Sequence, residues 1–347
     1  MPRLRDLGEF EAIRRLTAAR GRAIADAGVV VDAGDDAAVL APRPGRELVA
    51  TTDVFLEGVH FLGGWLTAGE LGGRLAIANL SDLAAMAASP RWALLSIGAR
   101  PEHDLDDLIE TERGLADALA ADGAAVVGGN ITAVSGAEWL NLTLLGEGQP
   151  GRAWKRSGAR PGDLIAVTGH PGRSGAGCAL ARRLGSRARE ARWRPLLDAW
   201  LRPRSRVRLA WALAASDAVT AATDLSDGFA GDLGHVGEAS GVSAEIDAAL
   251  WPADDLLAAA ASALGMGEED LRLGPSDDYE LLLAIDPARA PAAATIAERE
   301  GSPLHVVGRF IGGSGPPVRV APDGSRRAIA PGGWDHFGGA TAGEPNP

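Results

Sequence analysis

Hydrophobic residues recur along the chain in two spacings, and these spacings predict a succession of helices and strands. Apolar residues three to four positions apart are typical of one helix face, and short apolar runs bounded by polar turns are typical of buried strands. Helical spacing predicts a first helix over residues 9–16 and a second over 104–121. Thr67-Ala68-Gly69-Glu70 is a capping-box pattern, so we expect a further helix from there to about Ala88, ahead of Pro90.

Strands are expected at the short apolar runs between these helices. Because helices and strands follow one another in mixed order, we expect an α+β fold rather than a doubly wound sheet. A chain of 347 residues is long enough for two cores, and Gln149-Pro150-Gly151 is the best candidate boundary. The sequence therefore predicts two α/β-layered domains, residues 1–150 and 151–347. The expected strands cover residues 37–40, 48–53, 92–99, 124–127, 138–147, 164–168, 219–223 and 281–285.

Carboxylate and hydroxyl side chains recur where these apolar runs end. In residues 48–61 a short apolar run leads into Thr51-Thr52-Asp53, where we expect the strand to end. An ordinary turn explains each such residue alone as well as metal binding does. For Asp82, which lies inside an apolar helix, a hydrogen bond to a neighbouring backbone group is an equally good explanation. Their repetition favours hard divalent ions, most simply Mg²⁺, because carboxylates near a core are costly unless paired or cation-bound. The recurring residues are Asp35, Asp36, Asp53, Asp82, Asn130, Asp224, Asp227, Asp277 and Asp278.

Composition and net charge limit the classes of molecule that this protein is expected to bind. The 46 acidic residues outnumber 34 basic ones, and a net charge of −12 argues against nucleic acid or an anionic membrane as the main partner. A small anionic ligand carried by Mg²⁺ remains compatible. Cys178 is the only cysteine, which excludes intramolecular disulfides and cysteine-rich zinc sites. No apolar run approaches the length of a membrane span and the first residues have no apolar signal core, so a cytoplasmic protein is expected.

The glycine-rich run 169–177 suggests a phosphate-binding loop but lacks the required ending. A Walker-type loop ends in Gly-Lys-Ser/Thr, and the only lysine in the sequence is Lys155. We expect a tight strand-to-helix turn whose backbone N–H groups could still face phosphate. The six histidines are scattered, and none forms a zinc pair at helical spacing. Gly332-Gly333-Trp334-Asp335-His336-Phe337 could be a surface tail, or its tryptophan could stack on a heteroaromatic ring.

With these motifs in order, the chain resembles the thiamine-monophosphate kinase family, in the superfamily that includes aminoimidazole ribonucleotide synthetase and selenophosphate synthetase. The resemblance extends from Gly8-Glu9-Phe10 to the Trp-Asp-His-Phe end, and each motif alone is weak. The motifs are Gly34-Asp35-Asp36-Ala37, Thr51-Thr52-Asp53, Gly58-Val59-His60-Phe61, Asn79-Leu80-Ser81-Asp82-Leu83-Ala84-Ala85-Met86, Arg156-Ser157-Gly158, Asp224-Leu225-Ser226-Asp227-Gly228 and Asp278-Tyr279-Glu280-Leu281.

The resemblance implies a homodimer whose N-terminal domains join their sheets in a shared barrel, with ATP and several Mg²⁺ ions between the N- and C-terminal domains. The N-terminal domain would then serve metal binding, ATP binding and dimerisation. Matched residue by residue, the implied metal ligands are Asp35, Thr51, Thr52, Asp53, Asp82, Asn130, Asp224 and Asp227. The implied ATP contacts are Gly129, Asn130, Arg156 and Ser226, and the implied thiamine phosphate contacts are His60, Asp277 and Trp334.

Two positions depart from the family pattern. The family usually has Gly-Gly-Asp where this chain has Gly128-Gly129-Asn130, and Gly-Glu-Asp-Tyr-Glu where it has residues 276–280 as Ser-Asp-Asp-Tyr-Glu. The first removes a negative charge and the second shortens a side chain by one methylene.

The implied reaction is transfer of the γ-phosphoryl group of ATP to thiamine monophosphate, giving thiamine diphosphate and ADP. A phosphate monoester is largely a dianion near neutral pH, so we assign no general base and no catalytic side chain beyond the metal ligands. Two alternatives stay open. One is another enzyme of the superfamily with a different substrate, and the other is a protein that binds ATP or thiamine phosphate without turnover.

Overall fold

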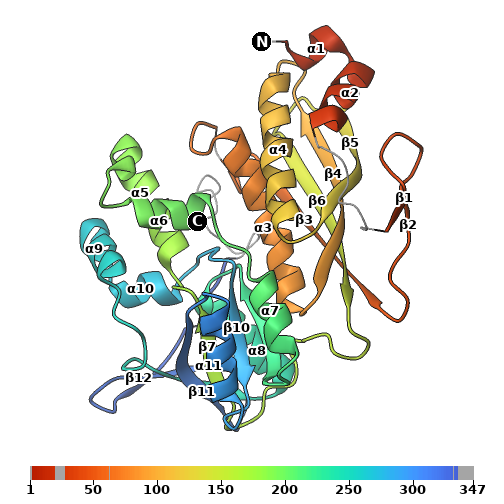
Figure 1. Ribbon diagram of the computed structural model, residues 1–347. Helices are drawn as coiled ribbons and strands as arrows, with labels where there is room; N and C mark the ends of the chain where they lie inside the picture. Colours follow the sequence, from red (N-terminus) through yellow and green to blue (C-terminus); the bar gives the residue numbers. More distant parts are fainter. Residues whose placement is uncertain (1, 20–27, 62, 331, 335–347) are drawn as a thin grey trace. The chain divides into compact units, whose positions relative to one another are not determined.

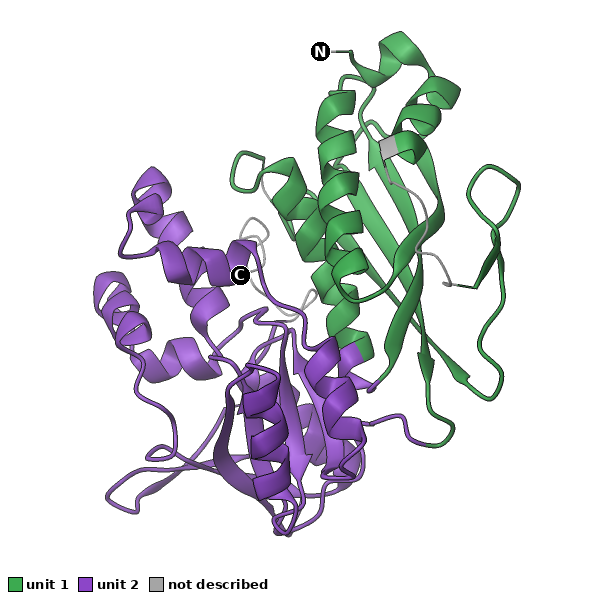
Figure 2. Ribbon diagram, viewed as in Figure 1, with its two compact units in different colours: residues 1–83, 88–151, 339–346 green, residues 84–87, 152–338, 347 purple. Residues whose placement is uncertain are grey.

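The computed structural model describes residues 2–19, 28–61, 63–330 and 332–334. These residues form two compact units, which we describe separately (Figure 2). Of the described residues, unit 1 contains 2–19, 28–61, 63–83 and 88–151, and unit 2 contains 84–87, 152–330 and 332–334. Within the described ranges, none of the helices is both long enough and apolar enough to cross a membrane.

Unit 1 is built on an open four-stranded mixed sheet with the strand order β3-β6-β4-β5. The β4–β5 pair is parallel and the other two pairs are antiparallel, so the predicted mixed α+β architecture is confirmed for this unit. Its elements are α1 (Leu4–Leu7), α2 (Glu9–Ala19), β1 (Val29–Val31), β2 (Val39–Leu40), β3 (Glu47–Leu56), α3 (Ala68–Ala85), β4 (Ser89–Ala99), α4 (Leu105–Ala121), β5 (Ala125–Ala133) and β6 (Trp139–Gly148) (Figure 1).

Helices α3 and α4 lie side by side over one face of this sheet (Figure 1). Alternate strand residues are buried on that face, as expected where side chains point to opposite sides in turn. The buried rows include Leu140, Leu142 and Leu144 on β6 and Leu95 on β4. The opposite face exposes apolar side chains: Leu48 is 57% exposed, Val54 48% and Leu94 37%. Unit 1 thus has one covered and one open sheet face.

The helix starts follow from local sequence. The N–H of Glu70 donates to Thr67 Oγ1 at 3.2 Å and the N–H of Thr67 donates to Glu70 Oε2 at 2.9 Å, which is the predicted capping box. Asp104 caps α4 by accepting the N–H of Asp106. Both predictions are confirmed, with α3 ending at Ala85 rather than Ala88.

Two strand ends were wrongly expected. Thr51-Thr52-Asp53 lies in the middle of β3, because β3 stays in register with β6 for ten residues, from Glu47 opposite Gly148 to Leu56 opposite Trp139. Gly128-Gly129-Asn130 likewise lies inside β5, which pairs with β4 as far as Ala133. Pairing with a long neighbouring strand extends both strands beyond the polar residues that were expected to end them.

Unit 2 is built on a seven-stranded sheet with the order β13-β12-β9-β11-β7-β10-β8, antiparallel except for the β12–β9 pair. Helix α8 packs Phe229, Leu233 and Val236 against this sheet. The elements are β7 (Leu164–Thr168), α5 (Arg173–Leu184), η1 (Gly185–Arg189), α6 (Arg194–Leu201), α7 (Val207–Ala214), β8 (Val219–Leu225), α8 (Phe229–Ser240), β9 (Ser243–Asp247), α9 (Asp255–Leu264), α10 (Glu268–Leu273), β10 (Glu280–Ile285), α11 (Ala290–Arg299), β11 (Leu304–Ile311), β12 (Val318–Val320) and β13 (Arg326–Ala328).

A second apolar cluster in unit 2 is formed by helices alone. Leu180 of α5, Trp193 and Leu196 near α6, and Leu257 of α9 pack together away from the main sheet core. The structure therefore confirms mixed α+β layers. Both main sheets are open within the described residues, and a barrel is not closed within one chain.

Candidate functional site

The first group of predicted site residues in unit 1 comes from β3 and α3. Strand alternation places Thr51 and Asp53 on the covered face, where α3 carries Asp82. The Thr51 hydroxyl donates a hydrogen bond to Asp82 Oδ2, so the partner expected for this carboxylate is present. Burial first, and the negative charge of Asp82 second, raise the pKa of Asp53 to about 7. One hydroxyl and two carboxylates are therefore brought together.

Thr52 and Asn130 lie on the other face of the same sheet. Asp53 belongs to a cross-strand row that ends at Gly129, whereas Asn130 belongs to the next row, with Ser96. Thr52 Oγ1 donates to the carbonyl of Leu142 at 3.1 Å, and the Asn130 side chain is exposed. Three strand spacings, about 14 Å, also separate β5 from β3. Within one chain, Asn130 and Thr52 do not join Asp53.

Two further predicted residues of unit 1 lie in loops. Asp35 is exposed between β1 and β2, and its carboxylate accepts the N–H of Asp36 at 2.9 Å. His60 follows β3 and stacks on Phe55, with ring centroids 5.5 Å apart and planes within 7°. The N–H of Leu56 donates to His60 Nδ1 at 3.1 Å, which leaves the proton of a neutral ring on Nε2. The His60 ring is thereby held in a fixed orientation.

The unit 2 residues gather where β8 ends and α8 begins. Asp224 is only 3% exposed in β8, and Ser226 and Asp227 follow in the half-buried turn. Arg156 Nε donates to Oγ1 of the neighbouring Thr223 at 3.2 Å, which holds the guanidinium beside this strand. The end of β8 and the turn after it therefore carry carboxylates and a hydroxyl, with the Arg156 cation held beside the strand.

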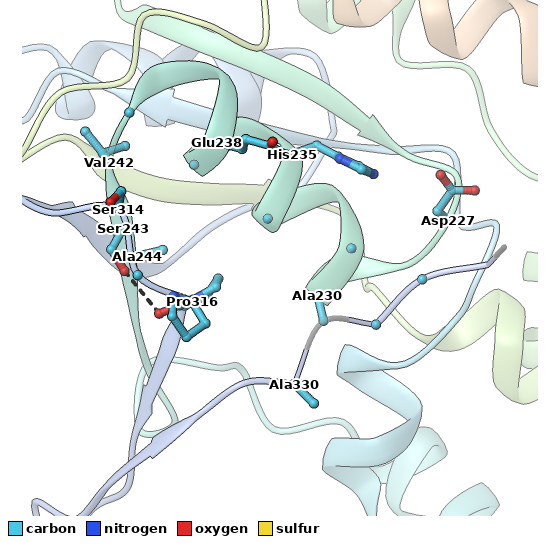
Figure 3. A pocket seen from close by; sticks show the side chains of 18 of the residues that line it. Asp227, Ala230, His235, Glu238, Val242, Ser243, Ala244, Ser314, Pro316 and Ala330 are labelled. Atoms are coloured by element: carbon cyan, nitrogen blue, oxygen red, sulfur yellow. Dashed lines mark hydrogen bonds between the residues drawn. The ribbon is translucent and has the colours of Figure 1, made fainter. Parts of the chain in front are cut away.

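A pocket of about 700 Å³ opens beside this turn, with Asp227 in its lining (Figure 3). Trp334 also lines this pocket. The backbone N–H of Trp334 donates to the carbonyl of Asp227 at 3.1 Å, which fixes the segment to the turn. A Cβ on Gly231 would lie 2.3 Å from the carbonyl oxygen of Gly332, so glycine is required for this approach. Asp335, His336 and Phe337, the rest of the predicted motif, lie outside the described residues.

The glycine-rich turn before α5 is occupied by the protein's own side chains. The N–H groups of Gly172 and Ser174 donate to the Asp278 carboxylate at 2.7 and 2.9 Å, and Gly175 N–H donates to Ser276 Oγ. Burial raises the pKa of Asp278 to about 7, although both N–H bonds act to lower it. The expectation that these amides face phosphate is wrong, because the buried Asp278 carboxylate accepts their hydrogen bonds instead.

Asp277 also points into unit 2. It is 4% exposed and accepts the hydroxyl proton of Ser174 at 2.7 Å. The structure does not bring Asp277 to the pocket that Trp334 lines.

Sequence reasoning missed two residues near Asp227. Asp232 and His235 on α8 lie with Asp227 so that one ligand atom of each is within 4.8 Å of the others. Burial first, and the charge of Asp227 second, raise the pKa of Asp232 to about 7. The sequence has no pair of histidines at helical spacing, but its Asp-x-x-His at residues 232–235 places both side chains on one helix face. That spacing, directly after Asp227, was the available signal.

The donor atoms of both groups fit Mg²⁺. Carboxylate and hydroxyl oxygens are its usual protein ligands, and Thr51, Asp53 and Asp82 offer them in unit 1, as Asp224 and Asp227 do in unit 2. Burial and a second negative charge both oppose ionisation of Asp53, and a divalent cation would offset both.

Comparison with known proteins agrees with the motif order. The family described as AIR synthase related protein, N-terminal domain, matches residues 34–147, and its C-terminal counterpart matches residues 160–321. A thiamine-monophosphate kinase of Caulobacter vibrioides is 33% identical over 321 residues, covering 88% of this chain and 85% of that protein.

Solved structures give the same result. Thiamine-monophosphate kinase from Stenotrophomonas maltophilia K279a superposes with a TM-score of 0.79 at 33% identity, covering 92% of this chain and 98% of that one. A structure described as "AaThiL complexed with AMPPCP and TMP" superposes with a TM-score of 0.73 at 29% identity, covering 97% and 99%. The resemblance drawn from the motifs is confirmed, and the chain belongs to the thiamine-monophosphate kinase family.

Proposed function

We propose that this protein transfers the γ-phosphoryl group of ATP to thiamine monophosphate, forming thiamine diphosphate and ADP. The observation that carries the proposal is family membership over nearly the whole chain, including a relative described with AMPPCP and TMP. The carboxylates at the matched positions of both units support it, because phosphoryl transfer needs charge neutralisation more than covalent chemistry.

Thr51, Asp53 and Asp82 in unit 1, and Asp224 and Asp227 in unit 2, would hold Mg²⁺. When bound, Mg²⁺ supplies the positive charge that lets two polyanionic phosphate groups approach. The protein's own part is to orient these carboxylates, and the hydrogen bond from the Thr51 hydroxyl does this for Asp82. Asp35 is a further proposed ligand from the β1–β2 loop, where it is free of burial.

The remaining contacts are divided between the substrates. Arg156, held beside β8, is proposed to contact the ATP phosphates together with Ser226, and Gly129 is proposed as a further ATP contact. Trp334 is proposed to face the thiamine ring across the pocket it shares with Asp227, because an indole face attracts a cationic ring. His60 is proposed as a second substrate contact.

Two residues are proposed to act differently from the family pattern. Asp277 is proposed to position the start of α5 through Ser174 rather than touch substrate, since it is buried. Asn130 and Thr52 are proposed not to bind the Mg²⁺ ion that Asp53 holds, since their side chains project from the opposite face of the sheet.

We further propose a homodimer in which two unit 1 sheets meet to form a shared barrel. The open face supports this proposal, because Leu48, Val54 and Leu94 expose apolar surface there and both sheet edges lack a partner strand within the described residues. A cytoplasmic location completes the proposal.

The test is incubation of the purified protein with ATP, Mg²⁺ and thiamine monophosphate, with products identified by mass spectrometry. Thiamine diphosphate and ADP are expected in equal amounts.

Trp334→Ala should raise the KM for thiamine monophosphate by about ten-fold, equivalent to about 1.4 kcal/mol, and should change the KM for ATP little. Absence of thiamine diphosphate under saturating conditions would reject the proposal, and equal effects of the variant on both KM values would remove Trp334 from the substrate contacts.

A further inference from the structure

We propose that Asp227, Asp232 and His235 form a site for a divalent transition-metal ion of the Zn²⁺ or Mn²⁺ class. Asp227 is shared with the proposed Mg²⁺ ligands, whereas Asp232 and His235 belong to no role described above. The proposal rests on where these three side chains lie and does not depend on the kinase activity.

The fold brings the three ligands together from one turn and one helix. Asp232 and His235 are three residues apart on α8, so they lie on the same helix face. Asp227 lies in the turn just before α8, and Figure 3 shows the His235 side chain extending along the helix toward it. One carboxylate oxygen from each aspartate and one imidazole nitrogen lie within 4.8 Å of one another.

The buried Asp232 carboxylate gives independent evidence for a cation site. It is 0% exposed, and its Oδ2 accepts the N–H groups of Asp227 and Gly228 at 3.3 and 3.2 Å. Its Oδ1 is buried and has no hydrogen-bond partner among the described residues. An unpaired buried carboxylate oxygen is costly, and a cation held by the three side chains would satisfy it.

The histidine decides the class of ion. Mg²⁺ binds oxygen ligands almost exclusively, whereas an imidazole nitrogen with two carboxylates suits zinc, manganese and related ions. Such ions hold each ligand atom at about 2.0–2.2 Å, which places neighbouring ligand atoms roughly 3–3.5 Å from one another. The present spacing of up to 4.8 Å is wider, so a rotamer change of the exposed His235 is needed to close the site. Three protein ligands also leave a coordination position open toward the pocket that Trp334 lines.

The experiment measures Zn²⁺ binding to the full-length, chelator-stripped protein by competition with a chromophoric chelator, without nucleotide or thiamine monophosphate. Wild type is expected to bind Zn²⁺ in the presence of millimolar Mg²⁺, and His235→Ala should weaken the affinity at least about ten-fold. Glu238→Gln is the matched control, because Glu238 lies one helical turn further along α8, lines the same pocket and is not among the three. Its affinity should equal that of wild type.

The Co²⁺-loaded protein gives a second readout. Its visible absorption should report nitrogen coordination in wild type and lose that signature in His235→Ala. Equal Zn²⁺ affinity in wild type and His235→Ala, displacement by Mg²⁺ at similar concentrations, or no Zn²⁺ binding would each overturn the site. Because His235 is exposed, its replacement tests the site even where Asp232→Asn fails to fold. A protein that binds Zn²⁺ this way but makes no thiamine diphosphate would reject only the kinase proposal.

Discussion

At the scale of single residues, Asp53 shows how the candidate site depends on charge. Burial and Asp82 raise the pKa of its carboxyl to about 7, well above that of an aspartate in the unfolded chain. Between about pH 4 and 7 the folded protein therefore binds a proton that the unfolded chain has lost. In the absence of metal, the free energy of unfolding should fall as pH rises through this window.

The Asp53→Asn variant isolates this effect, because asparagine keeps the size and cannot titrate. Between pH 5.5 and 8, metal-free wild type should lose about 2 kcal/mol more stability than the variant, measured by urea unfolding. Excess Mg²⁺ should abolish this additional loss of stability in wild type, since a bound cation favours the ionised form of Asp53. The variant should also lose most of the kinase activity. A parallel pH dependence in both proteins would show that Asp53 does not carry the shifted proton.

Residue-level predictions from sequence were accurate where a local partner decided the outcome. The need for a partner at Asp82 was foreseen, and Thr51 supplies it. The side of the sheet on which Asn130 lies could not be foreseen, because the β4–β5 register shifts by one residue between Ala93 and Leu94. One such shift moves a strand's side chains to the other face.

At the scale of elements, the crossing of α3 and α4 depends on two glycines that no sequence pattern singled out. A Cβ on Gly72 would lie 1.8 Å from the carbonyl oxygen of Thr111, and one on Gly114 would lie 2.1 Å from that of Gly69. The helices themselves were predicted from capping and periodicity. Their closeness was not, since it depends on which faces meet after folding.

Gly72→Ala should therefore destabilise the protein by about 1–3 kcal/mol through overpacking. Gly73→Ala is the control, because the nearest atom to its Cβ would be 3.8 Å away and alanine favours helices. We expect the control to be neutral or slightly stabilised in urea unfolding. Equal loss in both variants would mean that helix propensity or the unfolded state, and not the crossing, sets the effect.

At the scale of the whole molecule, the open sheet face of unit 1 bears on the proposed dimer. The sequence predicts buried strands here, but α3 and α4 cover only one face of the sheet, and the apolar residues of the other face stay exposed within one chain. An unpartnered face is invisible to periodicity, which reports that a strand is apolar and not what covers it.

Sedimentation velocity should give twice the chain mass for wild type and the chain mass for Val54→Asp, because a charge on this face would be buried without a partner. Met266→Asp is the control, since Met266 is exposed to a similar extent, 46% against 48%, in unit 2. It should sediment as wild type does. A Val54→Asp protein that keeps twice the chain mass would place any dimer contact elsewhere.

The Asp278 carboxylate, bonded to the amides of Gly172 and Ser174, competes with any phosphate from solution for these two N–H groups. A group tethered in the same chain acts at an effective concentration of about millimolar or more, whatever the surrounding solution contains. Free ATP or inorganic phosphate would have to displace this internal anion, which is already bonded and desolvated. The glycine-rich turn before α5 is thus occupied by the protein's own carboxylate, so we expect nucleotide to bind at other groups of this acidic protein.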